Sequence, residues 1–273
     1  MLKDDNLNKL AITHYENFPV GSFLIPKKYR DALHLIYAFA RVADDIADEL
    51  NDTKNNKIKL LEEWENNLNE AIDKNSDNPF FIKLANQIEQ FKIPLKYFSD
   101  LIIAFKMDCN HSQPKNMDEL LFYCTKSANP IGRIYLTLIG KNTDENFILS
   151  DNLCTALQVT NFVQDISIDS KRNRFYIPFS IENGILYNSK NNYYDKKNII
   201  SSFIKIIKDM FINSKPLINK LSYPFNLELS LIWNGGMRII NKIEKDNFAI
   251  LTQRPKLFMN DKIYIFLKSI INK

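Results

Sequence analysis

The sequence predicts an all-α protein, because helical periodicity covers most of its 273 residues, no segment alternates cleanly between apolar and polar residues, and glycine is scarce. Only 6 glycines occur in the chain, whereas hairpin-rich folds and dinucleotide-binding α/β folds depend on glycine at turns and phosphate loops. Apolar residues recur at intervals of three and four positions. We therefore expect helices near residues 3–16, 27–51, 56–74, 78–91, 94–109, 117–140, 146–170, 196–220, 226–250 and 261–272.

The predicted helices are separated by short polar breaks rather than by long linkers. Asn, Asp, Ser and Pro interrupt the helical pattern at residues 73–79, 92–94, 111–116 and 142–146. The longest polar stretch, residues 186–198, is either a loop or a lid. Pro130, within the segment 117–140, either kinks a helix by removing a hydrogen bond or marks a helix boundary. The sequence contains no repeat of solenoid period, and we expect one domain spanning residues 1–273.

Charge and cysteine content exclude several classes of protein. The net charge is only +4 and no run of Lys or Arg is interleaved with aromatic residues, so we expect no nucleic-acid partner. The histidines lack the paired spacing of a zinc site. The three cysteines lie in apolar stretches without CxxC spacing, which is typical of reduced core residues; they are Cys109, Cys124 and Cys154.

The two ends of the sequence differ in how they could relate to a membrane. The first ten residues, MLKDDNLNKL, lack the basic and then apolar profile of a signal peptide. No run of about 18 uncharged apolar residues occurs, and we expect a cytoplasmic protein. Residues 262–273, KIYIFLKSIINK, are basic and amphipathic. They form either a final helix packed on the core or a peripheral contact with a membrane surface.

A first acidic cluster occupies the stretch YAFARVADDIADE, residues 37–49. On a helix, its polar side chains form one stripe, which consists of Tyr37, Arg41, Asp44, Asp45 and Asp48. Carboxylates at this spacing repel one another, and burial beside Ala and Val raises the energetic cost further. Arg41 supplies one compensating charge, and Mg²⁺ is a natural source of the remainder. Taken alone, the cluster is more typical of a solvated helix face than of a metal site.

A second cluster in LQVTNFVQDISID, residues 157–169, strengthens the metal interpretation. Asn161, Asp165 and Asp169 stand at i, i+4 and i+8, one helical turn apart, and Gln158 lies near the same face. Apolar residues between them indicate that this column faces an interior space; they are Val159, Phe162, Val163, Ile166 and Ile168. Two oxygen-rich columns are what a chain needs to bind Mg²⁺ ions around one diphosphate, whose departure the metal assists.

The segment KRNRFYIP, residues 171–178, adds cations and an aromatic residue directly after Asp169. Arg174 is a candidate phosphate ligand because its planar guanidinium can donate two parallel hydrogen bonds. Arg172 is either a similar ligand or a cation that stabilises the end of the helix dipole. The sequence has no GxxxxGK[ST] motif for a nucleoside triphosphate. Aromatic rings beside such a site could stabilise a carbocation, so these residues together indicate prenyl diphosphate chemistry.

The motifs YAFARVADDIAD and LQVTNFVQDISID, followed by NRFYIP, resemble those of the squalene/phytoene synthase family of head-to-head prenyl synthases. The resemblance runs from HYENFP at residues 14–19 to about residue 255 and rests on two long motifs in the expected order. The segments ENFPVGSFLIP (16–26) and YCTKSANPIGRIYL (123–136) look most like the hydroxysqualene synthase branch.

The resemblance implies an all-α isoprenoid-synthase bundle with a central cavity and two acidic motifs facing each other across its mouth. By matched position, the Mg²⁺ ligands would be Asp44, Asp48, Asn161, Asp165 and Asp169, with Asp45 added from its place in the first stripe. The diphosphate would contact His14, Asn17, Tyr37, Arg41, Gln158 and Arg174. Phe18 and Gln164 lie beside these motifs as further substrate-binding candidates, and Tyr123 and Tyr176 would border the reacting carbons. Residues 234–243 and Arg254 are candidates for the cavity wall.

The implied reaction converts presqualene diphosphate and water to hydroxysqualene and diphosphate, without NADPH. The chain departs from many relatives at Gln164, where they carry Arg, and this change could favour a ready-made intermediate over condensation. The alternative within the family is condensation of two prenyl diphosphates to presqualene diphosphate, squalene, dehydrosqualene or phytoene. Alternatives from other classes are a terpene cyclase and a non-catalytic helical scaffold protein. The complete acidic columns argue against the scaffold protein.

Overall fold

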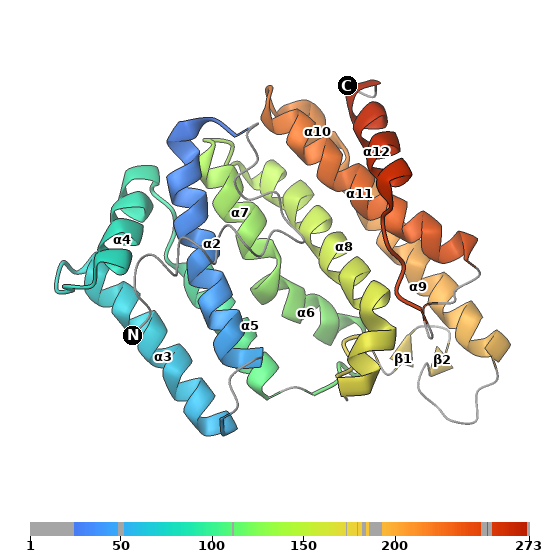
Figure 1. The fold of residues 1–273 in the computed structure, drawn as a ribbon, viewed down its shortest axis with the longest axis horizontal. Coiled ribbons are helices and arrows are strands. Elements are labelled where there is room, and N and C mark those ends of the chain that lie inside the picture. Colours follow the sequence, from blue (N-terminus) through green and yellow to red (C-terminus); the bar gives the residue numbers. More distant parts are fainter. Residues whose placement is uncertain are drawn as a thin grey trace. The chain divides into compact units, whose positions relative to one another are not determined.

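The computed structural model describes residues 25–48, 52–110, 112–172, 174–178, 180–181, 184–185, 193–246, 250 and 253–271. These residues form an all-α fold, as predicted (Figure 1). The helices are α2 (Lys27–Asp48), α3 (Lys54–Ile72), α4 (Pro79–Phe91), α5 (Lys96–Cys109), α6 (Met117–Ser127), α7 (Asn129–Leu138), α8 (Asp144–Asp169), the 3₁₀ turn η1 (Ser170–Arg172), α9 (Tyr193–Ser214), α10 (Pro216–Lys220), α11 (Phe225–Lys245) and α12 (Met259–Ile271). One antiparallel pair joins β1 (Ser180–Ile181) to β2 (Gly184–Ile185).

Helix starts follow side-chain caps that the sequence carries. Thr53, Asn78, Asn116 and Thr143 each precede a helix, and each side chain accepts a hydrogen bond from a backbone N–H of the first turn. Such caps satisfy donors that have no partner within the helix. The predicted helix at residues 3–16 lies outside the described residues.

Two long helices of the prediction are in fact divided. The segment 117–140 breaks at Ala128, between α6 and α7, and Pro130 is the second residue of α7. Pro130 therefore marks a boundary rather than a kink, because the first turn of a helix needs no N–H at that position. The segment 196–220 breaks in the same way before Pro216, where α9 ends and α10 begins.

The contacts group the chain into two compact units. Unit 1 consists of Met1–His111 and Arg133–Asn142, and unit 2 consists of Ser112–Gly132 and Thr143–Lys273. The first acidic stripe lies in unit 1 and the Asn161–Asp169 column lies in unit 2. A single domain over residues 1–273 stays a prediction.

Unit 1 packs α2 against α3, α4 and α5 around an aromatic core. The ring of Phe39 lies 5.8 Å from Trp64 and 5.3 Å from Phe98, and the Trp64 indole donates a 3.2 Å hydrogen bond to the Phe39 carbonyl. Ala38, Val42 and Ala43 are buried beside Phe39. This packing fixes which face of α2 is buried and which carries the acidic stripe.

Unit 2 is built around α8, which contacts α6, α9, α10 and α11. Two close approaches require glycine. A Cβ on Gly132 would lie 2.6 Å from the Cys154 Sγ, and one on Gly236 would lie 2.5 Å from the Phe211 ring. Cys124 and Cys154 are free, buried thiols, as predicted, and burial raises the pKa of each to about 12. Cys109 is also free but only partly buried.

None of the helices within the described ranges is long and apolar enough to cross a bilayer.

Candidate active site

The polar stripe of α2 carries a compact ion-pair cluster. The Arg41 guanidinium lies 3.0 Å from an Asp44 oxygen and 2.6 Å from an Asp45 oxygen. The three side chains are partly exposed, at 20% for Arg41, 40% for Asp44 and 28% for Asp45. Arg41 thus supplies the compensating charge that the sequence predicts.

One cation shared by two carboxylates leaves this face of α2 acidic. Asp48, one turn beyond Asp44, is exposed and adds a third carboxylate. Burial raises the pKa of the Tyr37 hydroxyl, Asp44 and Asp45 add to the effect, and the Arg41 charge opposes it. Tyr37 therefore stays neutral and can donate a hydrogen bond at neutral pH, for example to a phosphate oxygen.

The second column lies on one unbroken helix, α8. Asn161, Asp165 and Asp169 are all partly exposed at one-turn intervals, and Gln158 is partly exposed as well. Four of the five apolar residues that we expected to flank the column are buried, namely Val159, Phe162, Val163 and Ile166. Ile168 is the exception, because it is 38% exposed.

The segment after α11 returns to this column and binds it at two neighbouring residues. The Arg254 guanidinium pairs with the Asp165 carboxylate, with Nε bonded to Oδ1 and a second nitrogen 3.4 Å from Oδ2. The Gln164 amide donates a 2.6 Å hydrogen bond to the Pro255 carbonyl. Asp165 therefore has a cationic partner from a distant part of the sequence, and Gln164 anchors the backbone next to that partner.

Three aromatic rings gather beside the column within unit 2. The Phe162 and Tyr176 rings are parallel at 4.3 Å, and Tyr123 of α6 lies 5.9 Å from Phe162 and 6.2 Å from Tyr176. Phe162 is adjacent to Asn161 in α8. The aromatic trio, which consists of Tyr123, Phe162 and Tyr176, therefore adjoins the oxygen donors of α8 through Phe162.

The chain beyond α8 is held in place by backbone contacts. The Arg174 N–H donates a 3.0 Å hydrogen bond to the Asp169 carbonyl, and the Gln113 amide donates a 2.9 Å bond to the Ile177 carbonyl. These bonds keep Arg174, which is partly exposed, near the end of the oxygen column. The Arg172 side chain lies outside the described residues, as do His14, Asn17 and Phe18.

The donor set suits a hard divalent cation. Within the part of the chain that the structure describes, no group of three or more His, Cys, Asp or Glu side chains is arranged to hold a metal. Mg²⁺, however, usually takes one or two carboxylates and completes its shell with water and substrate phosphate oxygens. Asn161, Asp165 and Asp169 on one face of α8 offer such oxygens, and so do Asp44 and Asp48 on α2.

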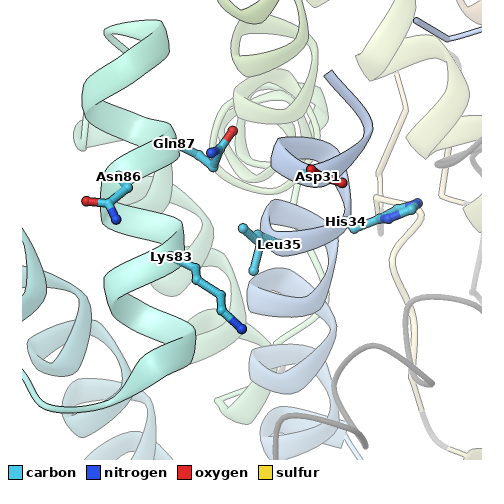
Figure 2. A pocket seen from close by; sticks show the side chains of 6 residues that line it. All are labelled: Asp31, His34, Leu35, Lys83, Asn86 and Gln87. Atoms are coloured by element: carbon cyan, nitrogen blue, oxygen red, sulfur yellow. The ribbon is translucent and has the colours of Figure 1, made fainter. Parts of the chain in front are cut away.

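A separate groove on unit 1 lies between α2 and α4 (Figure 2). It measures about 330 Å³ and is lined by Asp31, His34, Leu35, Lys83, Asn86 and Gln87. Lys83 and Gln87 extend toward α2, whereas His34 points away from α4. The predicted site residues are absent from this lining, and the groove does not form part of the candidate site.

The sequence predicts Arg254 only as a candidate for the cavity wall and carries no sign of its pairing with Asp165. The two residues are 89 positions apart, and a lone Arg before Pro carries no signal for its partner. No sequence pattern predicts that the Pro255 carbonyl accepts a hydrogen bond from Gln164, because every residue has a carbonyl group.

A family model, related sequences and solved structures all indicate the same family. A family model described as squalene/phytoene synthase matches residues 12–260. A hydroxysqualene synthase from Zymomonas mobilis is 36% identical over 167 residues, which cover 61% of this chain and 56% of that protein. A phytoene synthase from Mycobacterium tuberculosis is 34% identical over 167 residues, 61% of this chain and 54% of that protein. The chain thus spans a little over half the length of these relatives.

The fold is also similar to solved structures. The crystal structure of squalene synthase HpnC from Alicyclobacillus acidocaldarius superposes with a TM-score of 0.81 at 28% identity, covering 89% of this chain and 94% of that one. The described helices therefore have the isoprenoid-synthase arrangement.

Proposed function

The chain belongs to the squalene/phytoene synthase family, and we propose that it is a magnesium-dependent synthase that converts presqualene diphosphate and water to hydroxysqualene and diphosphate. The observation that carries this proposal is the α8 column of Asn161, Asp165 and Asp169 next to the aromatic trio. Oxygen donors can hold a metal diphosphate, and the rings can face the cation that its departure leaves. The hydroxysqualene synthase from Zymomonas mobilis, 36% identical to this chain, supports the choice of product.

The carboxylates would hold Mg²⁺ together with the substrate phosphate. The proposed ligands are Asp44, Asp48, Asn161, Asp165 and Asp169, with Asp45 remaining on Arg41. When bound, Mg²⁺ neutralises charge on the diphosphate and makes it a better leaving group.

Cationic and neutral donors would orient the diphosphate. Arg41 and Arg174 each lie beside one of the acidic motifs and can donate two parallel hydrogen bonds to phosphate oxygens. Arg254 is paired with Asp165 of the second motif and is a further candidate donor there. Tyr37 and Gln158 are neutral donors at the two motifs. These guanidinium groups offset only part of the carboxylate charge at the two motifs, and Mg²⁺ would offset the remainder.

The aromatic trio would protect the reacting carbons. In the proposed step the C–O bond to diphosphate breaks, both electrons leave with the diphosphate, and a cyclopropylcarbinyl cation remains. The faces of Tyr123, Phe162 and Tyr176 carry negative electrostatic potential and stabilise such a cation. After the carbon skeleton rearranges, a water oxygen attacks the cation and loses one proton, which gives the alcohol.

A second candidate is the condensation of two prenyl diphosphates within the same family. The phytoene synthase from Mycobacterium tuberculosis, 34% identical, and the squalene synthase structure, 28% identical, support this alternative. Gln164 favours the first candidate, since its amide is bound to the Pro255 carbonyl and it brings no charge to a second diphosphate.

The deciding experiment incubates the full chain with Mg²⁺ and either presqualene diphosphate or farnesyl diphosphate, with and without NADPH. We expect hydroxysqualene from presqualene diphosphate, unchanged by NADPH, and no consumption of farnesyl diphosphate. Consumption of farnesyl diphosphate alone would establish the condensation instead. Failure to turn over either substrate would favour the scaffold alternative.

A further inference from the structure

The last helix, α12, is attached to α11 mainly through polar groups. Asp261, Ile265 and Ser269, one turn apart, form its buried face. Asp261 lies 2.7 Å from both Arg238 and Lys242 of α11, and the Asn234 amide donates a 3.0 Å hydrogen bond to the Ser269 hydroxyl. Figure 1 shows α12 at the end of the chain, packed along α11. Both helices belong to unit 2.

The opposite side of α12 carries large apolar side chains in solvent. We call this surface the outer face; it consists of Met259, Ile263, Phe266, Leu267, Ile270 and Ile271. Each of these side chains is between 44% and 77% exposed. An ordinary surface helix directs such residues to the core, and soluble proteins rarely expose a continuous apolar patch. A buried face that is polar at two of its three positions and an apolar outer face are the reverse of that pattern, which indicates that another apolar surface covers the outer face.

The charges around the outer face are positive. Lys256 and Lys262 are exposed, and Lys268 is partly exposed. Asp261 is the only acidic residue between positions 253 and 271, and it is buried and paired with two cations. The cation at Lys268 lies 5.5 Å from the ring of Tyr264, so it borders the apolar residues directly. An apolar surface edged by lysines is complementary to an anionic lipid headgroup layer with hydrocarbon beneath it.

We propose that the outer face of α12 is a docking surface for an anionic lipid membrane. With 13 residues, α12 is too short to span a bilayer, so it lies in the plane of the interface. Its apolar side chains enter the boundary between headgroups and acyl chains. The lysine stems extend along the same boundary and keep their ammonium groups at the phosphates. This inference does not depend on the proposed reaction, since it rests on α12 alone.

The test is co-sedimentation of the full chain with vesicles of phosphatidylcholine, with or without phosphatidylglycerol. We expect binding to the anionic vesicles. The triple variant Phe266→Ser, Leu267→Ser, Ile270→Ser should bind roughly a hundredfold more weakly and keep the thermal midpoint of the wild type, because the three side chains are exposed. The affinity of the double variant Lys262→Gln, Lys268→Gln for anionic vesicles should be about tenfold lower than that of the wild type.

A matched control removes exposed apolar residues elsewhere in unit 2. Ile148 of α8 and Ile212 of α9 are 62% and 58% exposed, and the variant Ile148→Ser, Ile212→Ser should bind vesicles like the wild type. The proposal would be overturned if the triple variant bound vesicles as tightly as the wild type. It would also be overturned if the wild type bound neutral vesicles as tightly as anionic ones. A lowered thermal midpoint of the triple variant would overturn it as well, because it would mean that the chain itself covers the face. A wild-type dimer that ignores vesicles and becomes monomeric in the triple variant would assign the face to a second copy.

Discussion

At the scale of single residues, Asp165 has one observed partner and one proposed role. It is paired with the Arg254 guanidinium, and it is the central member of the proposed Mg²⁺-binding column. For the proposed metal-binding role a removable cation is an advantage, because an unpaired carboxylate beside apolar residues is unfavourable. The Arg254 guanidinium can then donate to the phosphate oxygens that arrive with the metal.

Replacing Asp165 with Asn tests the catalytic part of this account. We expect kcat/KM for presqualene diphosphate to fall about a hundredfold or more, since a charged group at the leaving diphosphate is lost. The free energy of unfolding should change by less than about 1 kcal/mol, because Asp165 and Arg254 are 27% and 31% exposed. Asp151→Asn on the same helix is the matched control and should retain activity. Comparable loss in both variants would contradict a specific role for Asp165.

Gln164 positions the segment that carries Arg254. The variant Gln164→Leu removes the 2.6 Å hydrogen bond to the Pro255 carbonyl but keeps the size of the side chain. We expect a loss of about 1 kcal/mol in stability and a thermal midpoint lower by about 2–4 °C. Calorimetry and steady-state kinetics check the two effects, and kcat/KM should fall as Arg254 loses its support.

The variant Gln164→Arg tests whether the charge at this position selects the reaction. If the missing charge selects the reaction, this variant should consume farnesyl diphosphate. Unchanged product ratios would remove Gln164 from the explanation of specificity.

At the scale of elements, the adjacent glycines of α11 report how closely it packs on α8 and α9. A Cβ on Gly236 would lie 2.5 Å from the Phe211 ring and 2.9 Å from Leu157, whereas a Cβ on Gly235 would meet nothing within 4 Å. Gly236→Ala should therefore lower the free energy of unfolding by about 1–3 kcal/mol. Gly235→Ala should raise it by about 0.5–1 kcal/mol through helix propensity. Chemical denaturation of both variants measures the difference, and effects of the same sign would contradict this packing.

The attachment of α12 should depend on pH through Asp261. The hydrogen bonds from the Lys242 ammonium and the Phe258 N–H, and then that from Arg238, hold the pKa of this carboxyl well below its usual range, against the opposing effect of burial. A lowered pKa in the folded state means that Asp261 stabilises the fold fully above the ordinary pKa of about 4. The contribution is lost as pH falls from there through the lowered value.

The variant Asp261→Asn measures this contribution. Near neutral pH we expect it to reduce the free energy of unfolding by about 2–3 kcal/mol, because a buried acceptor of three donors loses its charge. The gap between variant and wild type should narrow below about pH 4. Asp246→Asn, at the exposed end of α11, is the control. A gap that stays constant down to pH 2 would contradict the ion network.

The helices were largely predictable from local signals, and their breaks were less so. Thr53, Asn116 and Thr143 are caps that can be read directly from the sequence, and the helices after them begin close to the predicted positions. The break before Pro216 was missed, and the segment around Pro130 was left open between a kink and a boundary, because apolar periodicity continues through both prolines. The proline itself was the available signal, since it has no backbone N–H with which to continue the helical hydrogen bonds.

At the scale of the whole molecule, the sequence predicted which residues share a helix face better than it predicted their partners in space. Spacing along one helix was enough to group Asn161, Asp165 and Asp169, and the family resemblance added Tyr123 and Tyr176. The structure places these two tyrosines with Phe162 in one trio. The Arg254–Asp165 pair joins residues 89 positions apart, and such a contact depends on the packing of α8 and the returning chain, which no local pattern encodes.

The most direct test of the central claim is the source of oxygen in the product. The full chain is given presqualene diphosphate and Mg²⁺ in ¹⁸O-labelled water, and the lipid product is analysed by mass spectrometry. The account predicts hydroxysqualene whose hydroxyl oxygen carries the label, because the C–O bond to diphosphate breaks and water captures the cation. An alcohol that retains unlabelled oxygen, or a hydrocarbon product that forms only with NADPH, would contradict it.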